Sequence, residues 1–252
     1  MTDSENFQLI TSLLPVARQA GQAIMKVYHQ GVESQHKKDG SPVTEADCLA
    51  EAIILAGLAD VAADVTVISE ENAESHSIEA PDRFFLVDPL DGTREFIRAD
   101  GKGAFTVNIA LVEHGVPVAG VIYAPAIDEL YWGGRGQGAF LNDGQISTRT
   151  PDPRKIVALA SRSHRDQQTK QWLADNNISE TVSIGSSLKF CLVARGQADI
   201  YPRFGPTMEW DTAAGHAILC AAGGKVEKPD GGEFTYGKSG YKNGAFIARG
   251  SL

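Results

Sequence analysis

The sequence predicts a layered α/β protein, and three patterns along the chain support this fold class. Apolar residues in the first 30 positions recur at steps of three or four, which is the period of an α-helix. Residues 104–141 form short β-rich runs separated by turn residues, a pattern typical of an antiparallel sheet. After residue 150, β-rich and helical segments alternate, as they do in layered α/β proteins.

The first part of the chain predicts two helices separated by a polar, glycine-containing loop over residues 31–42. The first helix has one apolar stripe, and Pro15 either kinks it or marks its true start. The second helix opens at Thr44 with Asp47 three residues on, because Thr-x-x-Asp resembles a capping box. The positions expected to be buried are Leu9, Leu13, Val16, Ala20, Ile24 and Val27 in the first helix and Leu49, Ala50, Ile53, Ile54 and Val61 in the second.

Two short β-rich runs follow, at residues 65–68 and 84–87, and each ends in acidic residues. The first run leads into Ser69-Glu70-Glu71, and the second leads into Asp88-Pro89-Leu90-Asp91. Carboxylates at the ends of strands are typical of a ligand site in a layered protein.

The order of predicted segments changes after Pro151 and Pro153, from consecutive strands to alternating strands and helices. The 252 residues suit one large domain or two closely packed lobes. We therefore expect one folded unit over residues 1–252, with an N-terminal lobe of about 1–150 and a C-terminal lobe of about 151–252. The segments predicted in the second lobe are a strand at 156–160, a helix at 165–176, a strand at 182–184, a helix at 188–195 and a last helix from Asp211 to Gly223-Gly224.

Composition excludes several classes of protein. A content of 42% apolar residues excludes a disordered chain, and a net charge of −9 argues against binding of polymeric nucleic acid and against a polybasic membrane anchor. The three cysteines, Cys48, Cys191 and Cys220, lack the spacing of a disulfide framework or a zinc site, so we expect a reducing compartment. The acidic N-terminus does not resemble a signal peptide, and no segment predicts a transmembrane helix, so we expect a cytoplasmic location.

The most informative motif is the hexapeptide Asp88-Pro89-Leu90-Asp91-Gly92-Thr93. Pro89 holds Asp88 extended and Gly92 permits a tight turn, so two carboxylates and the carbonyl between them can converge. Such an oxygen-only ligand set suits Mg²⁺. A helical turn that begins near Gly92 would offer its backbone N–H groups to a phosphate. The alternative is a type I or II turn with a capping aspartate.

Three further acidic residues each have two interpretations. Taken alone, Glu70 is expected to be a solvated loop carboxylate, and Asp47 and Asp211 are expected to cap helices. All three nevertheless lie at a strand end or a helix start, where side chains gather around a cleft.

The D-x-D-x-T motif of haloacid-dehalogenase phosphatases nearly matches Asp88 to Thr93, but one extra residue separates the aspartates here. That spacing favours a shared metal over a phospho-aspartate.

The hexapeptide, with Ser69-Glu70-Glu71 before it and Trp210-Asp211-Thr212-Ala213-Ala214-Gly215 after it, resembles the signature motifs of the inositol monophosphatase family. The resemblance runs nearly end to end, and residues 185–191 and 201–207 are most similar to the bacterial 3'(2'),5'-bisphosphate nucleotidases. It implies an alternating αβαβα sandwich of the sugar-phosphatase type. Glu209 departs from the apolar residue expected before Trp210, and we expect it to alter the rim of the cleft.

The resemblance implies a phosphatase that uses two or three Mg²⁺ ions, is sensitive to lithium, and converts 3'-phosphoadenosine 5'-phosphate to AMP and phosphate in sulfur assimilation. It also implies roles for single residues. Asp47 and the Thr93 hydroxyl correspond to the pair that orients and deprotonates the attacking water, and Glu70 is also catalytic. Gly92 and Thr93 correspond to backbone phosphate binders. The metal ligands implied are Glu70, Asp88, the carbonyl of Leu90, Asp91 and Asp211, of which all but Asp88 also contact the substrate.

Substrate recognition is predicted from charge and from the same resemblance. Ser186, Lys189 and Arg203 are candidates for the second phosphate, because Lys and Arg supply positive charge and bidentate geometry. An exposed surface charge is the alternative for the two cations. His164 is a candidate contact for the adenine.

The expected partner is therefore a small bisphosphorylated nucleotide, bound by a monomer or a homodimer. Peripheral association with the cytoplasmic face of the inner membrane is implied by the resemblance alone. Two other functions remain open: an inositol monophosphatase or sugar bisphosphatase of the same fold, and a non-catalytic sensor of nucleotide or metal.

Overall fold

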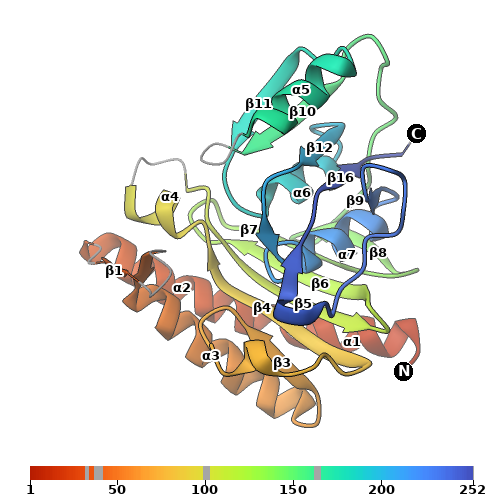
Figure 1. The fold of residues 1–252 in the computed structure, drawn as a ribbon. Helices are drawn as coiled ribbons and strands as arrows, with labels where there is room; N and C mark the ends of the chain where they lie inside the picture. The colour runs from red at the N-terminus through yellow and green to blue at the C-terminus, as the bar shows by residue number, and fades with distance from the viewer. Residues whose placement is uncertain (32–33, 37–41, 99–102, 162–165, 252) are drawn as a thin grey trace.

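Helices and sheets alternate through the computed structural model, which describes residues 1–31, 34–36, 42–98, 103–161 and 166–251 (Figure 1). Three N-terminal helices cover one face of a seven-stranded sheet, and two central helices cover its other face. A five-stranded sheet lies beyond the central helices, with one further helix beside it. This arrangement confirms the predicted layered α/β fold and its αβαβα order.

The N-terminal segment forms two helices where one was predicted. Thr2 caps α1 (Asp3–Ser12), and α2 (Leu14–Gln30) follows directly after Leu13. Pro15 lies in the first turn of α2, where its missing N–H has no helical partner to lose. Pro15 therefore marks the true start of the second helix.

The third helix, α3 (Glu45–Ala62), begins as predicted, with a capping box between Thr44 and Asp47. The prediction that Leu49 and Val61 are buried is wrong, because they are 41% and 40% exposed. This helix is apolar on nearly every side, so its hydrophobic period does not define a single face. Its buried residues are Ala46, Asp47, Ala50, Ile54, Leu58 and Ala62.

The segment before α3, predicted as a loop, contains a short hairpin. Its strands β1 (Ser34–His36) and β2 (Pro42–Thr44) pair antiparallel. β2 leads directly into α3, so the hairpin sets where that helix begins.

The first sheet has the strand order β3-β4-β5-β6-β7-β8-β9. β3 is parallel to β4 and every later pair is antiparallel, which confirms the predicted meander. Along β4, Phe85 and Val87 pack toward the N-terminal helices, while Phe84 and Leu86 pack toward the central helices. Asp88 continues the second row, because successive side chains alternate between faces. The strands are β3 (Thr66–Ser69), β4 (Arg83–Asp91), β5 (Thr106–Glu113), β6 (Val116–Ala124), β7 (Glu129–Gly134), β8 (Gly138–Leu141) and β9 (Gly144–Ile146).

The second sheet has the strand order β11-β10-β12-β16-β14. α5 (Gln167–Asp175) connects β10 to the parallel β11, as the alternating pattern predicts. The strands after β11 were not predicted, because each has only two to four residues. The strands of this sheet are β10 (Val157–Ser161), β11 (Glu180–Ile184), β12 (Ile200–Arg203), β14 (Lys225–Glu227) and β16 (Phe246–Arg249). β13 (Thr207–Met208) and β15 (Lys242–Asn243) pair antiparallel with each other in a separate two-stranded sheet.

The central layer consists of α6 (Leu188–Ala194) and α7 (Ala213–Ala221). A Cβ added to Gly215 of α7 would lie 2.4 Å from a ring carbon of Phe190 in α6. One added to Gly120 of β6 would lie 2.8 Å from the Ala214 carbonyl oxygen. Glycine thus lets α7 approach both its neighbouring helix and the first sheet, and this close packing fixes the start of α7 over the sheet.

Candidate active site

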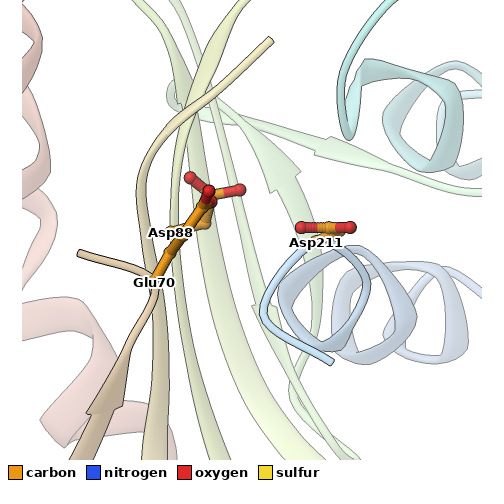
Figure 2. A group of neighbouring side chains, drawn as sticks. All are labelled: Glu70, Asp88 and Asp211. Carbon is orange, nitrogen blue, oxygen red and sulfur yellow. The ribbon is translucent and has the colours of Figure 1, made fainter. Parts of the chain in front are cut away.

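Three carboxylates from distant parts of the chain converge at the ends of β3 and β4 (Figure 2). Glu70 follows β3, Asp88 lies in β4, and Asp211 faces them from the segment just before α7. One carboxylate oxygen of each lies within 4.8 Å of those of the other two. Asp88 is 1% exposed, and the other two side chains are half-buried.

Strand pairing explains why Glu70 and Asp88 meet. The Glu70 N–H donates to the Val87 carbonyl at 3.1 Å, so the parallel pairing of β3 and β4 continues to the residue before Asp88. The pairing of β4 with β5 then shifts between Asp88 and Asp91. Pro89 lies at this irregularity, where a residue without an N–H is tolerated. The strand therefore bends just where its carboxylates are presented.

The sequence after this bend confirms the predicted turn. Gly92 has a φ of +95°, and α4 (Thr93–Arg98) begins at the next residue. A Cβ at position 92 would lie 2.8 Å from the Ala104 carbonyl oxygen, so both conformation and space require glycine here. Leu90 N–H donates to Asp88 Oδ1 at 3.1 Å, which fixes the orientation of that carboxylate.

Burial and mutual repulsion both act on the carboxylates. Burial raises the pKa of Asp88 well above its usual value, and the charges of Glu70, Asp91 and Asp211 raise it further. Burial likewise raises the pKa of Asp211, with added repulsion from Asp91 and Glu70. A bound cation would reverse this repulsion. Carboxylate and carbonyl oxygens are the ligands that Mg²⁺ prefers, so this donor set fits a hard divalent cation.

Asp91 is held by a serine that the sequence analysis did not select. Ser187 Oγ lies 2.7 Å from Asp91 Oδ2 and 2.8 Å from the Asp211 carbonyl oxygen, and it accepts a hydrogen bond from Asn108 Nδ2 at 2.9 Å. The buried Ser187 therefore links the end of β4 to the segment before α7. In the sequence Gly185-Ser186-Ser187, nothing distinguishes this serine from its neighbour, which was the predicted one.

Asp47 caps α3 with one carboxylate oxygen and faces Thr93 with the other. Its Oδ2 accepts hydrogen bonds from the Thr44 N–H at 2.7 Å and from the Thr44 hydroxyl at 2.6 Å, which confirms the capping box. Its Oδ1 lies 3.4 Å from the Thr93 hydroxyl, which also lies 3.2 Å from the Leu90 carbonyl oxygen. Asp47 is 1% exposed. The capping contact thus orients the carboxylate whose other oxygen faces Thr93.

Asp211 does not cap α7. The N-cap residue is Thr212, and it makes no capping hydrogen bond through its side chain. Asp211 instead turns back, and its Oδ2 accepts the Met208 N–H at 2.8 Å. The capping interpretation of Asp211 is therefore wrong, and the carboxylate is set by the preceding loop.

The two cations predicted to bind phosphate differ in exposure. Lys189 is 4% exposed, so its interpretation as an exposed surface charge is wrong. Its ammonium donates to the Ser186 carbonyl at 2.6 Å and lies 5.1 Å from the centre of the Tyr201 ring. Burial lowers the pKa of Lys189 to about 8, although the negative charge of Asp91 opposes the shift. Arg203 is half-buried and donates to the Pro206 carbonyl at 2.8 Å.

A cavity of about 970 Å³ opens beside these groups, a size typical of a small-molecule site. Ser186 and Glu71 line it, and Ser186 adopts a positive φ of 51°. His164, the predicted adenine contact, lies outside the described residues. The predicted residues that line the cavity are Glu70, Asp91, Gly92, Thr93, Ser186, Lys189, Arg203 and Asp211.

Glu209 does not lie on the rim of this cavity. Its side chain is 0% exposed and binds the loop that contains Lys238. The prediction that it alters the rim is therefore wrong. An acidic residue between two apolar ones was a signal of an unusual environment, but the sequence does not name its partner.

Comparison with known proteins places the chain in a family. Residues 6–249 match the inositol monophosphatase family. The chain belongs to this family. It is 47% identical to the 3'(2'),5'-bisphosphate nucleotidase CysQ of Salmonella typhimurium, over 90% of this chain and 94% of that protein. It is 46% identical to the enzyme of the same name from Escherichia coli K12, with the same coverage.

Solved structures of inositol monophosphatase family members share the fold. The crystal structure of CysQ from Bacteroides thetaiotaomicron superposes with a TM-score of 0.84 at 37% identity, over 98% of each chain. An inositol monophosphatase from Thermotoga maritima superposes with a TM-score of 0.81 at 25% identity, over 100% of this chain and 93% of the other. The recognition of the family and the αβαβα fold from the sequence are both confirmed.

Proposed function

We propose that this chain is a Mg²⁺-dependent 3'(2'),5'-bisphosphate nucleotidase that hydrolyses 3'-phosphoadenosine 5'-phosphate to AMP and phosphate. The observation that carries the proposal is the identity of 45–47% to nucleotidases of that name over 90% of the chain. The cluster of carboxylates beside two cations supports it, because it suits a metal ion and a doubly phosphorylated substrate together.

The proposed metal ligands are the three carboxylates of the cluster and two neighbouring groups of β4. We expect them to bind two or three Mg²⁺ ions. When bound, Mg²⁺ supplies Lewis-acid polarisation of a phosphoryl oxygen and lowers the pKa of water. Hydrogen bonds orient three of these ligands: the Leu90 N–H donates to Asp88, the Met208 N–H donates to Asp211, and the Ser187 hydroxyl lies 2.7 Å from Asp91. The proposed ligands are Glu70, Asp88, the carbonyl of Leu90, Asp91 and Asp211.

Asp47 and Thr93 are the proposed route for the proton of the attacking water. When the Thr93 hydroxyl donates to Asp47 Oδ1, its oxygen can accept a hydrogen bond from water. Water oxygen then attacks phosphorus, the bond from phosphorus to the 3'-oxygen breaks, and the water proton passes through Thr93 toward Asp47. The 3'-oxygen leaves as the hydroxyl of AMP by taking up a proton from solvent, and Asp47 later returns its proton to solvent. Glu70, which lines the cavity together with Thr93, is proposed to help orient the water.

The phosphates are proposed to lie between the acidic and the basic parts of the cavity. The backbone N–H groups of Gly92 and Thr93, at the turn into α4, suit the phosphate that is hydrolysed. Lys189 and Arg203 suit the second phosphate, and the ammonium of Lys189 would regain a full charge beside it. Ser186 is proposed to contact the same phosphate, and His164 the adenine.

Phosphate release measured on a panel of substrates tests the proposal. With Mg²⁺ present, 3'-phosphoadenosine 5'-phosphate is expected to have a higher kcat/KM than inositol 1-phosphate or a sugar bisphosphate. Arg203→Ala should reduce that preference, because it removes one charge that the second phosphate requires. A higher kcat/KM for inositol 1-phosphate would instead identify an inositol monophosphatase. Release unaffected by EDTA would exclude the metal, and no release at all would indicate a sensor.

A location in the cell is the last part of the proposal. None of the helices in the described residues has the length and apolar character needed to cross a membrane. We propose that the protein acts in the cytoplasm on a small bisphosphorylated nucleotide and that its two lobes fold as one unit. Inhibition by Li⁺, implied by the family resemblance, is part of the same proposal.

A further inference from the structure

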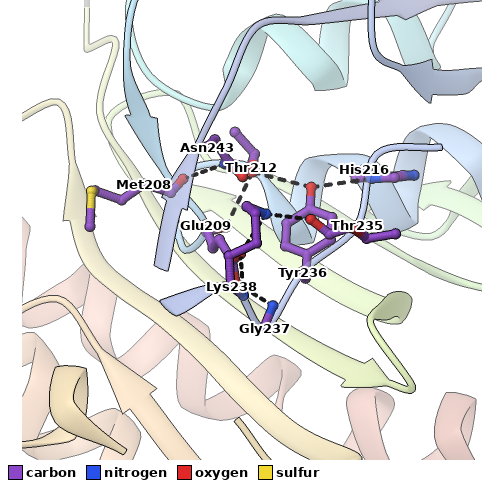
Figure 3. A network of polar contacts seen from close by, with 9 residues as sticks. All are labelled: Met208, Glu209, Thr212, His216, Thr235, Tyr236, Gly237, Lys238 and Asn243. Carbon is purple, nitrogen blue, oxygen red and sulfur yellow. Dashed lines mark hydrogen bonds and ion pairs between the residues drawn. The ribbon is translucent and has the colours of Figure 1, made fainter. Parts of the chain in front are cut away.

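We infer that Glu209 and Lys238 are positioning residues for Asp211: an ion pair between a fully buried carboxylate and a half-buried ammonium sets the loop that carries Asp211 into the carboxylate cluster. The inference rests on the proposed metal-dependent function. The two residues and their partners form one polar network (Figure 3). Neither residue lines the cavity itself.

Both oxygens of the Glu209 carboxylate are occupied. Oε2 accepts the Gly237 N–H at 2.7 Å, and Oε1 accepts the Lys238 N–H at 3.0 Å and lies 2.5 Å from the Lys238 ammonium. That ammonium also lies over the rings of Phe234 and Tyr236, at 5.5 and 5.3 Å from their centres. A fully buried carboxylate is tolerated only with such partners. The pair therefore ties residue 209 to the loop at 234–238.

The backbone of Glu209 is fixed at the same time. Its N–H donates to the Tyr241 carbonyl at 2.8 Å, and its carbonyl accepts the N–H groups of Thr212 at 3.2 Å and Ala213 at 3.0 Å. The segment from 209 to 213 is thus a closed turn at the start of α7. Asp211 lies inside that turn, and its Oδ2 is held by the Met208 N–H. A shift of residue 209 would therefore turn the Asp211 carboxylate.

A second chain of hydrogen bonds supports the turn from the side of the 234–238 loop. Burial lowers the pKa of His216 to about 4, so the ring is neutral and its Nδ1–H can donate to the Tyr236 hydroxyl at 3.1 Å. Tyr236 then donates to the Thr212 hydroxyl at 3.1 Å, and Thr212 donates to the Glu209 carbonyl at 3.2 Å. Asn243 donates to both the Thr212 hydroxyl and the Met208 carbonyl, each at 2.9 Å. The hydroxyls of Tyr236 and Thr212 therefore each donate in one defined direction.

Stability alone does not account for this ion pair, in which Glu209 is fully buried and the Lys238 side chain is 36% exposed. Well-packed apolar residues can replace such a pair with little or no loss of stability, because desolvation offsets much of the attraction. What the charges add is a fixed geometry, and residues behind metal ligands tune metal affinity by fixing the ligands. Glu209 is two positions from Asp211 and bonded around the turn that contains it. The geometry therefore points to a role of the Glu209–Lys238 pair in metal affinity, through the position of Asp211.

The test is Mn²⁺ binding to the whole protein, stripped of metal with EDTA and dialysed, without substrate. The electron paramagnetic resonance signal of free Mn²⁺ gives the Kd. Glu209→Gln is expected to raise this Kd about 10-fold, the lower end of the range seen when a direct partner of a metal ligand is removed, because Glu209 acts on Asp211 through the backbone of the turn. Lys238→Met should also raise the Kd, whereas Lys238→Arg, which keeps the positive charge, should have a Kd close to wild type. The matched control is Lys225→Met, which removes an ion pair with Glu227 (2.8 Å) at an exposed site in β14.

The outcomes separate this inference from the proposed function. Wild-type Kd values in both Glu209→Gln and Lys238→Met overturn the inference, as does an equal loss of affinity in Lys225→Met. If Glu209→Gln lacks a native circular dichroism spectrum, Lys238→Met decides, since it keeps both backbone hydrogen bonds to Glu209. Wild-type protein that binds no Mn²⁺ and releases no phosphate overturns the proposed function, and the inference with it. Wild-type protein that binds Mn²⁺ while the variants match it overturns the inference alone.

Discussion

Asp47→Asn separates the two roles of a single carboxylate. In the wild-type protein Oδ2 accepts two hydrogen bonds from Thr44, and Oδ1 faces the Thr93 hydroxyl. An asparagine has one acceptor oxygen and one amide group that only donates. If the oxygen stays with Thr44, the amide faces Thr93 and donates where the carboxylate accepted. The cap can survive this substitution, but acceptance of a proton from Thr93 cannot.

The two roles carry different magnitudes. Loss of a helix cap costs about 0.5–2 kcal/mol of stability. At about 2–4 °C per kcal/mol for a chain of this size, the melting temperature should fall by about 1–8 °C. Loss of a general base costs about 10² to 10⁴ in kcat. That factor equals about 3–5 kcal/mol in the activation barrier, so the effect on rate should exceed the effect on stability.

The assay is phosphate release from 3'-phosphoadenosine 5'-phosphate at saturating Mg²⁺, beside thermal unfolding of the same preparation. Thr44→Ala is the matched control, because it removes the capping hydroxyl and leaves the contact between Asp47 and Thr93. The control should lose melting temperature and keep a kcat close to wild type. If Asp47→Asn loses melting temperature and keeps its kcat, Asp47 is only a capping residue and the proton route is wrong.

Four other results are expected. Asp91→Asn should remove most phosphate release with an unchanged circular dichroism spectrum, because a charged ligand oxygen is lost; near-wild-type rates at saturating Mg²⁺ would exclude Asp91 as a ligand. In EDTA, the free energy of unfolding should gain a positive slope between pH 8 and 10.5 from Lys189, because burial lowers its folded-state pKa to about 8 and the unfolded chain keeps the proton in that range. Urea titrations at about pH 7.5 and about pH 9.5 should show this slope reduced in Lys189→Met, and an equal slope in both proteins would refute the assignment. Gly215→Ala should cost about 1–3 kcal/mol in urea unfolding, because its methyl group would lie 2.4 Å from the Phe190 ring, whereas Gly244→Ala, with nothing within 4 Å, should not. Finally, circular dichroism and tryptophan fluorescence should report one coincident unfolding transition, because a single buried cluster includes residues from both lobes, and two separate transitions would mean independent domains.

The parts of the site that the sequence predicted are those encoded by adjacent residues. The bend at Pro89, the turn at Gly92 and the capping box from Thr44 to Asp47 each depend on a few neighbours along the chain. Their geometry follows from backbone restrictions that a sequence displays directly. The meeting of Glu70 with Asp88 was also expected, since both end β-rich runs.

The parts that were not predicted depend on tertiary contacts. Ser187 rather than Ser186 holds Asp91, because the start of α6 rests against both β4 and the turn before α7. The partner of Glu209 is 29 positions away, at Lys238. The short strands at the end of the chain carry too few residues to show a period of two, and their pairing alone defines them. The exposure of Leu49 was not predicted for the same reason, because the packing of neighbouring elements decides which side of an evenly apolar helix is buried.

The order in which the carboxylates occur along the chain has a consequence for biosynthesis. About half of the chain separates Asp88 from Asp211, and β15, which pairs with the strand just before the turn at Asp211, comes later still. A growing polypeptide therefore presents only part of the cluster until Asp211 and β15 have left the ribosome. Because a ligand stabilises only the state that binds it, a divalent cation would selectively protect finished molecules. Protease resistance that depends on added Mg²⁺ would then distinguish completed protein from arrested chains in a translation reaction.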